Sequence, residues 1–268
     1  MHSNPEAAFD VRQVSYSYDN ITALRDVTVQ ILCGERVALL GANGSGKSTL
    51  LRLLAGLAFP ERGEVSFFGE CLAASRLQQE AFFFRFRRRT GIVFQNPDVQ
   101  LFNASVFDEV AFGPLQLRWP KDEVRRRVEE TLATLGIADL KNRVPHRLSL
   151  GEKKRVALAS VLVLDPEVLI LDEPTAGLDP GSQTQIIELL GRSVNGSKTV
   201  IMATHDLDAL EDIADRCYLL ENGRIAGEGK PMGILHNVEL LERTGLIRPH
   251  RHSHGEKPTG PHPHLHRK

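Results

Sequence analysis

The segment that most constrains this sequence is Gly41–Thr49, which reads Gly-Ala-Asn-Gly-Ser-Gly-Lys-Ser-Thr. An apolar run at 36–40 precedes it and is typical of a buried strand, while leucines at helical spacing follow it at 50–57. In this strand–loop–helix context the pattern Gly-x-x-x-x-Gly-Lys-[Ser/Thr] predicts a phosphate-binding loop. The alternative, a Gly/Ser turn without a ligand, does not explain why a strand and a helix flank it.

The residue types in the loop explain this chemistry. Gly41, Gly44 and Gly46 remove side chains, so that consecutive backbone N–H groups converge on a polyphosphate at the positive end of a helix. Lys47 then reaches the β- and γ-phosphates, and Ser48 offers its hydroxyl to Mg²⁺. We therefore predict a nucleoside triphosphate as ligand.

Length and charge narrow the class of protein. With 268 residues, the chain can form one large α/β domain or two smaller lobes. Its 33 basic and 34 acidic side chains give no general preference for nucleic acid, so no nucleic-acid partner is expected. Three scattered cysteines fit a reducing cytosol. The first residues lack the features of a signal peptide, and no run approaches the ~20 apolar residues that span a bilayer. Any membrane role is therefore expected to act through a partner.

Hydrophobic patterns predict the order of elements. Two or three short strands are expected in 9–35 and another in 64–69, which together form a β-rich lobe. A mostly helical insertion of about 74–146 follows, with a short strand at 91–95. The elements expected within and after it are helices at 77–89, 106–117 and 121–135, a helix from the 148–152 segment to 164, a strand at 167–172, a helix at 183–192, a strand at 199–203, a helix at 207–215 and a strand at 217–220. Alternating strands and helices predict a parallel sheet.

The helix at 77–89 combines arginines with phenylalanines. Its arginines at 85 and 87–89 are compatible with a patch for a partner or nucleic acid. The simpler prediction is a solvated face opposite buried Phe82, Phe83 and Phe86.

Polar side chains stand where three predicted strands end. Asp172 and Glu173 follow an apolar strand, so that Asp172 can hold magnesium and Glu173 can polarise the water that attacks the γ-phosphate. His205 ends the next strand, at the place of a γ-phosphate sensor, and Gln95 ends another. We predict that Glu173, His205 and Gln95 take part in catalysis.

With these residues assembled, the chain over about 9–240 resembles the nucleotide-binding subunit of an ATP-binding cassette (ABC) transporter. Gly41–Thr49 matches the Walker A loop, 168–172 the Walker B strand and Glu173 the catalytic glutamate. Tyr18 matches the aromatic residue that stacks on adenine. Gln95 matches the Q-loop glutamine, and His205 the switch histidine.

Two further segments carry the resemblance. The run 148–152 matches the family signature, with Leu150 where glycine is common and Glu152 where glutamine is frequent, and 176–179 matches the loop that crosses between partners. The resemblance implies that the signature residues Ser149 and Gly151 bind the ATP held by a second cassette, identical or paralogous. It implies ATP and Mg²⁺ as cofactors, with Mg²⁺ at Ser48, Gln95 and Asp172. Nucleotide contacts are implied at Tyr18, Gly41, Asn43, Gly44, Ser45, Gly46, Lys47, Ser48, Thr49, Ser149, Gly151, Glu152, Asp172 and Asp179.

The implied fold is α/β, a P-loop NTPase core of the ABC type with an antiparallel β lobe and an inserted helical subdomain. The implied ATPase domain covers 8–240, and a C-terminal extension covers 241–268.

A narrower resemblance points to the ATPases of energy-coupling-factor importers, in their cobalt and nickel branch. It rests on 94–102, 106–114, 148–157, 176–180 and 239–243. It implies a peripheral subunit at the cytoplasmic face of the membrane, working with an integral membrane coupling protein and a substrate-capture protein. A vitamin importer of the same architecture remains open, as does an ABC ATPase of DNA repair or translation. This chain has neither the long insertions of the repair proteins nor the second cassette of the translation proteins.

The segment from 248 onward is low in apolar residues and rich in Pro, Gly and His, a composition typical of disorder. It is either a binding segment for Ni²⁺, Co²⁺, Cu²⁺ or Zn²⁺ or a solvated tail without a role. Its histidines are His250, His252, His254, His262, His264 and His266.

Overall fold

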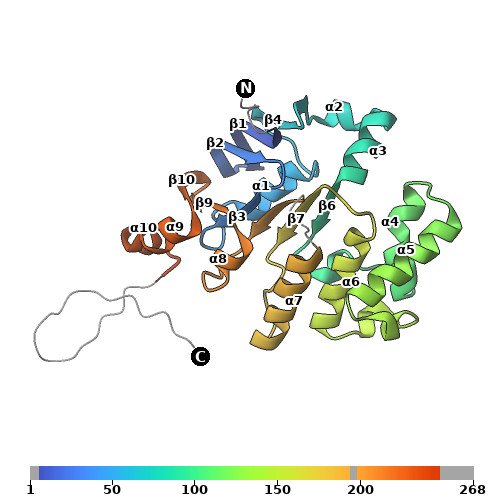
Figure 1. The fold of residues 1–268 in the computed structure, drawn as a ribbon. Helices are drawn as coiled ribbons and strands as arrows, with labels where there is room; N and C mark the ends of the chain where they lie inside the picture. The colour runs from blue at the N-terminus through green and yellow to red at the C-terminus, as the bar shows by residue number, and fades with distance from the viewer. Residues whose placement is uncertain (1–5, 194–197, 248–268) are drawn as a thin grey trace, which may run out of the picture.

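The computed structural model describes residues 6–193 and 198–247 (Figure 1). Its N-terminal part forms a four-stranded antiparallel sheet in the order β2-β1-β4-β5. These strands are β1 (Ala7–Tyr18), β2 (Ile21–Leu32), β4 (Arg62–Phe67) and β5 (Glu70–Cys71). The range 9–35 was predicted to hold two or three short strands; the structure has two, β1 and β2, and each is 12 residues long, with shifts of register along their pairing.

The central sheet has six strands in the order β10-β9-β3-β8-β7-β6. They are β3 (Arg36–Leu40), β6 (Thr90–Val93), β7 (Val168–Asp172), β8 (Thr199–Ala203), β9 (Arg216–Glu221) and β10 (Arg224–Gly229). All neighbours are parallel except β9 and β10, which form a hairpin. Since parallel strands end at the same edge, this sheet aligns the ends of β3, β6, β7 and β8.

Helices cover the central sheet and join its strands (Figure 1). Among the described residues, α4 to α6 pack together as a helical lobe, and α9 and α10 lie near β10. The helices are α1 (Lys47–Leu54), α2 (Ala74–Leu77), α3 (Glu80–Arg89), α4 (Val106–Gln116), α5 (Lys121–Thr134), α6 (Leu150–Leu162), α7 (Pro180–Ser193), α8 (Leu210–Ile213), α9 (Pro231–Leu235) and α10 (Val238–Arg243). Short 3₁₀ turns occur at Pro97–Val99, Ala138–Leu140 and Pro145–Arg147. No helix in the described ranges is long and apolar enough to cross a membrane.

Alternation along the central strands divides the core. Val168 and Ile170 of β7 pack with α1 and the antiparallel sheet, whereas Leu169 and Leu171 face the helical lobe. A third cluster joins β3 and β9 to α8, α9 and α10. Both faces of β7 and β8 are therefore buried, as expected of strands that are apolar throughout.

Several predicted elements differ from the structure. The range 77–89 contains the end of one helix and a second helix, with a break near residue 79, and the predicted helix at 207–215 is only the short α8. Within the range 74–146, β6 belongs to the central sheet, and helices lie on both sides of it in the sequence. β10 was not predicted, because its residues 224–229 lack a strong apolar alternation.

The prediction for the phenylalanines of α3 was wrong at one position. Phe82 and Phe86 are buried, but Phe83 is 38% exposed. Residues four apart share a helix face, whereas the neighbouring residue is rotated by about 100°. Phe83 therefore lies on the side where Arg87 packs over its ring.

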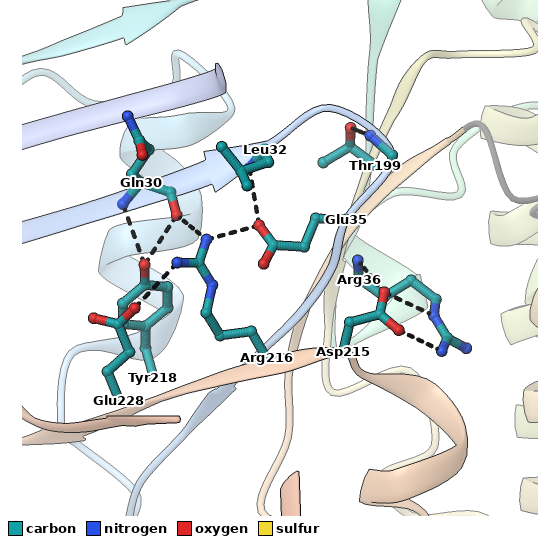
Figure 2. A network of polar contacts seen from close by, with 10 residues as sticks. Gln30, Leu32, Glu35, Arg36, Thr199, Asp215, Arg216, Tyr218 and Glu228 are labelled. Carbon is teal, nitrogen blue, oxygen red and sulfur yellow. Dashed lines mark hydrogen bonds and ion pairs between the residues drawn. The ribbon is translucent and has the colours of Figure 1, made fainter. Parts of the chain in front are cut away.

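A polar network joins the two sheets (Figure 2). The Arg216 guanidinium on β9 donates to the backbone carbonyl of Gln30 on β2 (2.5 Å) and to the Glu35 carboxylate (2.7 Å). The Tyr218 hydroxyl donates to the same carbonyl of Gln30 (2.9 Å), and Glu228 on β10 pairs with Arg216 (3.0 Å). These contacts fix the antiparallel sheet to the central sheet at the end of β2.

Candidate active site

At two positions, the loop between β3 and α1 has a backbone conformation that favours glycine. Gly41 and Gly46 have φ angles of 146° and 110°. A Cβ at Gly41 would lie 2.4 Å from the carbonyl oxygen of Leu220, and one at Gly46 would lie 2.8 Å from that of Ala23. The loop therefore packs directly on neighbouring backbone.

The loop also presents polar groups that suit an anionic ligand. The Ser45 hydroxyl is buried and makes no hydrogen bond among the described residues. Asn43 and Gly44 are exposed, and α1 begins at Lys47 after the N-cap residue Gly46, without a side-chain cap. Because the first N–H groups of a helix lack internal partners, this donor set fits a phosphate chain.

Lys47 is buried in the first turn of α1. Its Nζ donates to the carbonyl oxygens of Gly41 (2.7 Å) and Ala42 (3.1 Å), so that it lies along the loop. Burial lowers the pKa of Lys47, while the nearby carboxylates Glu173 and Asp172 oppose this effect. Thr49, two residues further along α1, is also buried.

Ser48 and Asp172 meet, although 124 positions separate them. The Ser48 hydroxyl donates to the Asp172 carboxylate at the end of β7 (3.1 Å). Burial raises the pKa of Asp172, and the hydrogen bond from Ser48 opposes this. A hydroxyl and a carboxylate beside a phosphate loop are oxygen ligands of the kind that Mg²⁺ prefers, so these two residues fit that ion.

The three predicted catalytic residues lie together, because Gln95 and His205 both contact Glu173. Its Oε2 accepts a hydrogen bond from Gln95 Nε2 (3.2 Å) and lies 3.2 Å from His205 Nδ1. These residues follow β6, β7 and β8, which are neighbours in the sheet. Glu173 is buried with a left-handed φ of 45°, whereas the His205 side chain is 58% exposed. The arrangement places one carboxylate between an amide and an imidazole.

The other predicted residues have local partners. Tyr18 packs edge-on against Tyr16 (4.9 Å between ring centroids) and accepts a hydrogen bond from Arg52 of α1 (3.3 Å). Ser149 and Glu152 bond to each other in a capping box at the start of α6.

Asp179 bonds to the backbone N–H and hydroxyl of Ser182 at the start of α7. The signature segment and the 176–179 loop lie against each other. A Cβ at Gly177 would be 3.2 Å from Leu150, and one at Gly151 would be 3.8 Å from Leu178.

Sequence reasoning missed one polar residue beside Glu173. Lys154 of α6 is buried, and its Nζ donates to the backbone carbonyls of Glu173 (3.1 Å) and Pro174 (2.9 Å). Burial lowers the pKa of Lys154 to about 8, although Glu173 opposes the shift. In the sequence it stands beside Lys153 in a polar run, and nothing there indicates which of the two lysines is buried.

The six tail histidines, His250 to His266, lie outside the described residues. Within 6–193 and 198–247, no three His, Cys, Asp or Glu side chains gather in a way that could hold a metal ion.

The fold and the site define a P-loop protein with an α/β cassette, a signature helix and carboxylates at adjacent strand ends. A profile of the family described as "ABC transporter" matches residues 24–176. The chain belongs to this family, as an ATP-binding, ATP-hydrolysing component, and the fold class predicted from the sequence is confirmed.

Three similar proteins indicate which members of the ABC transporter family this chain is similar to in sequence and fold. The nickel import ATP-binding protein NikO of Rhodobacter capsulatus is 52% identical over 243 residues, which are 90% of this chain and 96% of the relative. The energy-coupling factor transporter ATP-binding protein EcfA of Methanothermobacter thermautotrophicus is 44% identical over 90% of this chain and 76% of its own length.

The structure of cbiO1 from Clostridium perfringens, part of the ABC transporter complex cbiONQ, superposes with a TM-score of 0.76 at 39% identity, over 91% of this chain and 96% of that one. The resemblance to energy-coupling-factor ATPases is therefore confirmed.

Proposed function

We propose that this protein is the ATP-hydrolysing subunit that energises import of nickel or cobalt ions through a membrane partner. The observation that carries the chemistry is the convergence of Gln95 and His205 on the Glu173 carboxylate, next to the Ser48–Asp172 pair. The cargo is inferred from the likeness to a nickel import ATP-binding protein over nearly the full length of both chains.

Each polar residue of the site has a chemical task in this proposal. The loop N–H groups and the start of α1 bind the phosphates, and Lys47 turns from the carbonyls of Gly41 and Ala42 to the β- and γ-phosphates. Ser48 and Asp172 would hold Mg²⁺, which when bound would neutralise charge on the phosphate oxygens.

Hydrolysis depends on the buried carboxylate. Glu173 accepts a hydrogen bond from the attacking water and orients its lone pair toward the γ-phosphorus. Gln95 and His205 hold the carboxylate in place through its Oε2. His205 is exposed enough to reach the γ-phosphate when nucleotide is bound.

The signature residues complete the site of a second cassette. Ser149 and Glu152 make their hydrogen bonds locally, at the start of a helix that presents free N–H groups. We infer that Ser149, Gly151 and Asp179 bind nucleotide across a dimer interface, with Tyr18 against the base in its own subunit. The partner is an identical chain or a paralogue.

An exposed apolar surface near Gln95 is the proposed contact with the membrane partner. Val99 and Phe102 are 68% and 61% exposed, and the Phe102 ring packs edge-on against Phe112 of α4 (4.9 Å). Exposed aromatic residues grouped in this way mark interaction sites. The segment begins at Gln95, so that nucleotide-dependent movement of that residue reaches the partner at the cytoplasmic face of the membrane.

Uptake of labelled Ni²⁺ and Co²⁺ by cells that co-express the membrane partners tests this proposal. Wild type and Glu173→Gln are compared at equal expression, and we expect uptake to fall to background in the variant. Uptake by wild type no better than by the variant, with ATPase activity intact, would exclude these metals as cargo. The same cells would then be tested with labelled vitamins.

A further inference from the structure

Lys154 is a buried lysine whose partners are uncharged. It is 3% exposed, and its ammonium group donates to two backbone carbonyls, those of Glu173 and Pro174. Lysine is almost never fully buried without a partner, because its charge loses solvation there. The two hydrogen bonds to backbone carbonyls offset part of the free-energy cost of burying this ammonium group, and they hold the backbone of Glu173 and Pro174 in place.

The turn that Lys154 contacts is held from several sides. The N–H of Glu173 donates to Ala203 of β8 (3.0 Å), and its carbonyl accepts from Ala176 (3.2 Å) as well as from Lys154. Pro174 has no N–H, so it cannot contribute a donor of its own. The left-handed φ of 45° at Glu173 is uncommon for a residue with a side chain and persists only where surrounding contacts fix it.

The same helix carries the signature segment. Ser149 caps the start of α6, and Lys154 lies about one turn further along it. The neighbouring Lys153 pairs with Asp98 (2.8 Å) in the loop that follows Gln95. Two consecutive lysines of α6 thus contact the segments that follow β6 and β7.

We propose that Lys154 is a positioning residue, which holds the backbone of Glu173 so that its carboxylate is aligned for hydrolysis and links this alignment to the signature helix. The inference rests on the proposed role of Glu173 as the residue that polarises water. Glu173 is thus held by Gln95 and His205 through its side chain, and by β8 and Lys154 of α6 through its backbone.

The chemistry of the side chain fits this role. The Nζ of lysine has three donors when charged and two when neutral, so both carbonyls remain bonded in either state. Methionine has a similar length and no donor, whereas glutamine offers two N–H donors on one nitrogen. Lys154→Met therefore removes the hydrogen bonds with little change of volume, and Lys154→Gln retains donors.

The test compares these variants with Lys121→Met, a matched change at the exposed start of α5. Thermal unfolding, binding of a fluorescent ATP analogue and steady-state ATP turnover are measured on the full chain. We expect kcat of Lys154→Met to fall about tenfold or more, since displacing a catalytic group by 1 Å can cost on the order of 10²-fold. Analogue affinity should stay within about twofold, Tm should not fall, and Lys154→Gln should recover most of the activity.

A second comparison separates positioning from general damage. Adding Lys154→Met to Glu173→Gln should leave the residual single-turnover rate unchanged, because Lys154 acts through a carboxylate that is already absent. A further drop in that rate would overturn the inference, as would a kcat of Lys154→Met within twofold of wild type. Parallel loss of Tm and analogue binding would assign Lys154 a structural role instead. Full turnover by Glu173→Gln would refute the role of Glu173 itself.

Discussion

Gly223 lies in a turn that supports the phosphate loop from behind, and replacing it by alanine should damage both stability and nucleotide binding. Its N–H donates to the Ser45 carbonyl (3.0 Å), and its own carbonyl accepts from the Arg25 N–H (2.7 Å). A Cβ at Gly223 would lie 2.6 Å from the carbonyl oxygen of Ala23. This turn thus connects β2 to the loop between β3 and α1.

A matched control exists in the same chain. Asn222–Gly223 joins β9 to β10, and Phe68–Gly69 joins β4 to β5, both as two-residue turns with positive φ at each position. The φ angles of the two glycines are 77° and 74°. A Cβ at Gly69 would meet nothing within 4 Å. Alanine therefore brings the same backbone strain to both turns but a steric conflict only to Gly223.

The structure gives the size of the effect. The left-handed conformation costs alanine about 1–2 kcal/mol at either site. At Gly223 the Ala23 carbonyl must also move by about 0.8 Å to reach ordinary contact at 3.4 Å, and such overpacking adds about 1–3 kcal/mol. Since 1 kcal/mol shifts Tm by roughly 2–4 °C in a domain of this size, Gly69→Ala should lower Tm by roughly 2–8 °C and Gly223→Ala by roughly twice as much.

Nucleotide affinity gives the sharper distinction. Moving Gly223 displaces the Ser45 peptide, and we expect the Kd for ATP to rise about tenfold, equivalent to about 1.4 kcal/mol. Gly69→Ala should leave the Kd unchanged. Differential scanning fluorimetry and isothermal titration calorimetry on both variants supply the data. Equal Tm and equal Kd in the two variants would refute the argument that this turn supports the loop.

Other predictions concern the charged residues of the site. Glu173→Gln should bind ATP and form the dimer but lose nearly all hydrolysis in a phosphate-release assay, whereas Lys47→Ala should weaken nucleotide binding itself in titration. Burial raises the pKa of Asp172, so that the folded state loses stability as pH rises through the window above 3.8. Asp172→Asn should therefore raise the Tm of the nucleotide-free protein while it abolishes Mg²⁺-dependent turnover; a lower Tm would contradict this. Burial lowers the pKa of Lys154 to about 8 from 10.5, so the unfolded chain binds more protons between these values. Urea unfolding should show wild type gaining about 1–3 kcal/mol relative to Lys154→Met between pH 8 and 10.5, with no relative gain below pH 7.

The sequence by itself determined the elements whose chemistry is local. A glycine loop between an apolar strand and a helix, and carboxylates at a strand end, have meaning through spacing alone, so the phosphate loop and the Asp172–Glu173 pair were predicted from the chain. Gln95 and His205 were likewise placed at the ends of predicted strands, with roles in catalysis. The fold class and the family followed from these motifs.

The tertiary structure decided what depends on contacts between distant segments. Whether Lys153 or Lys154 is buried depends on how α6 packs against the turn after β7, and sequence spacing does not contain that orientation. The support of Ser45 by Gly223 joins residues 178 positions apart through backbone groups, which no side-chain pattern reveals. The phenylalanine-rich composition of the helix led to the prediction that Phe83 is buried. In the structure, the elements that pack on α3 cover the face that carries Phe82 and Phe86, and Phe83 is exposed. Local patterns fix which groups are available for chemistry, whereas packing fixes which of them meet.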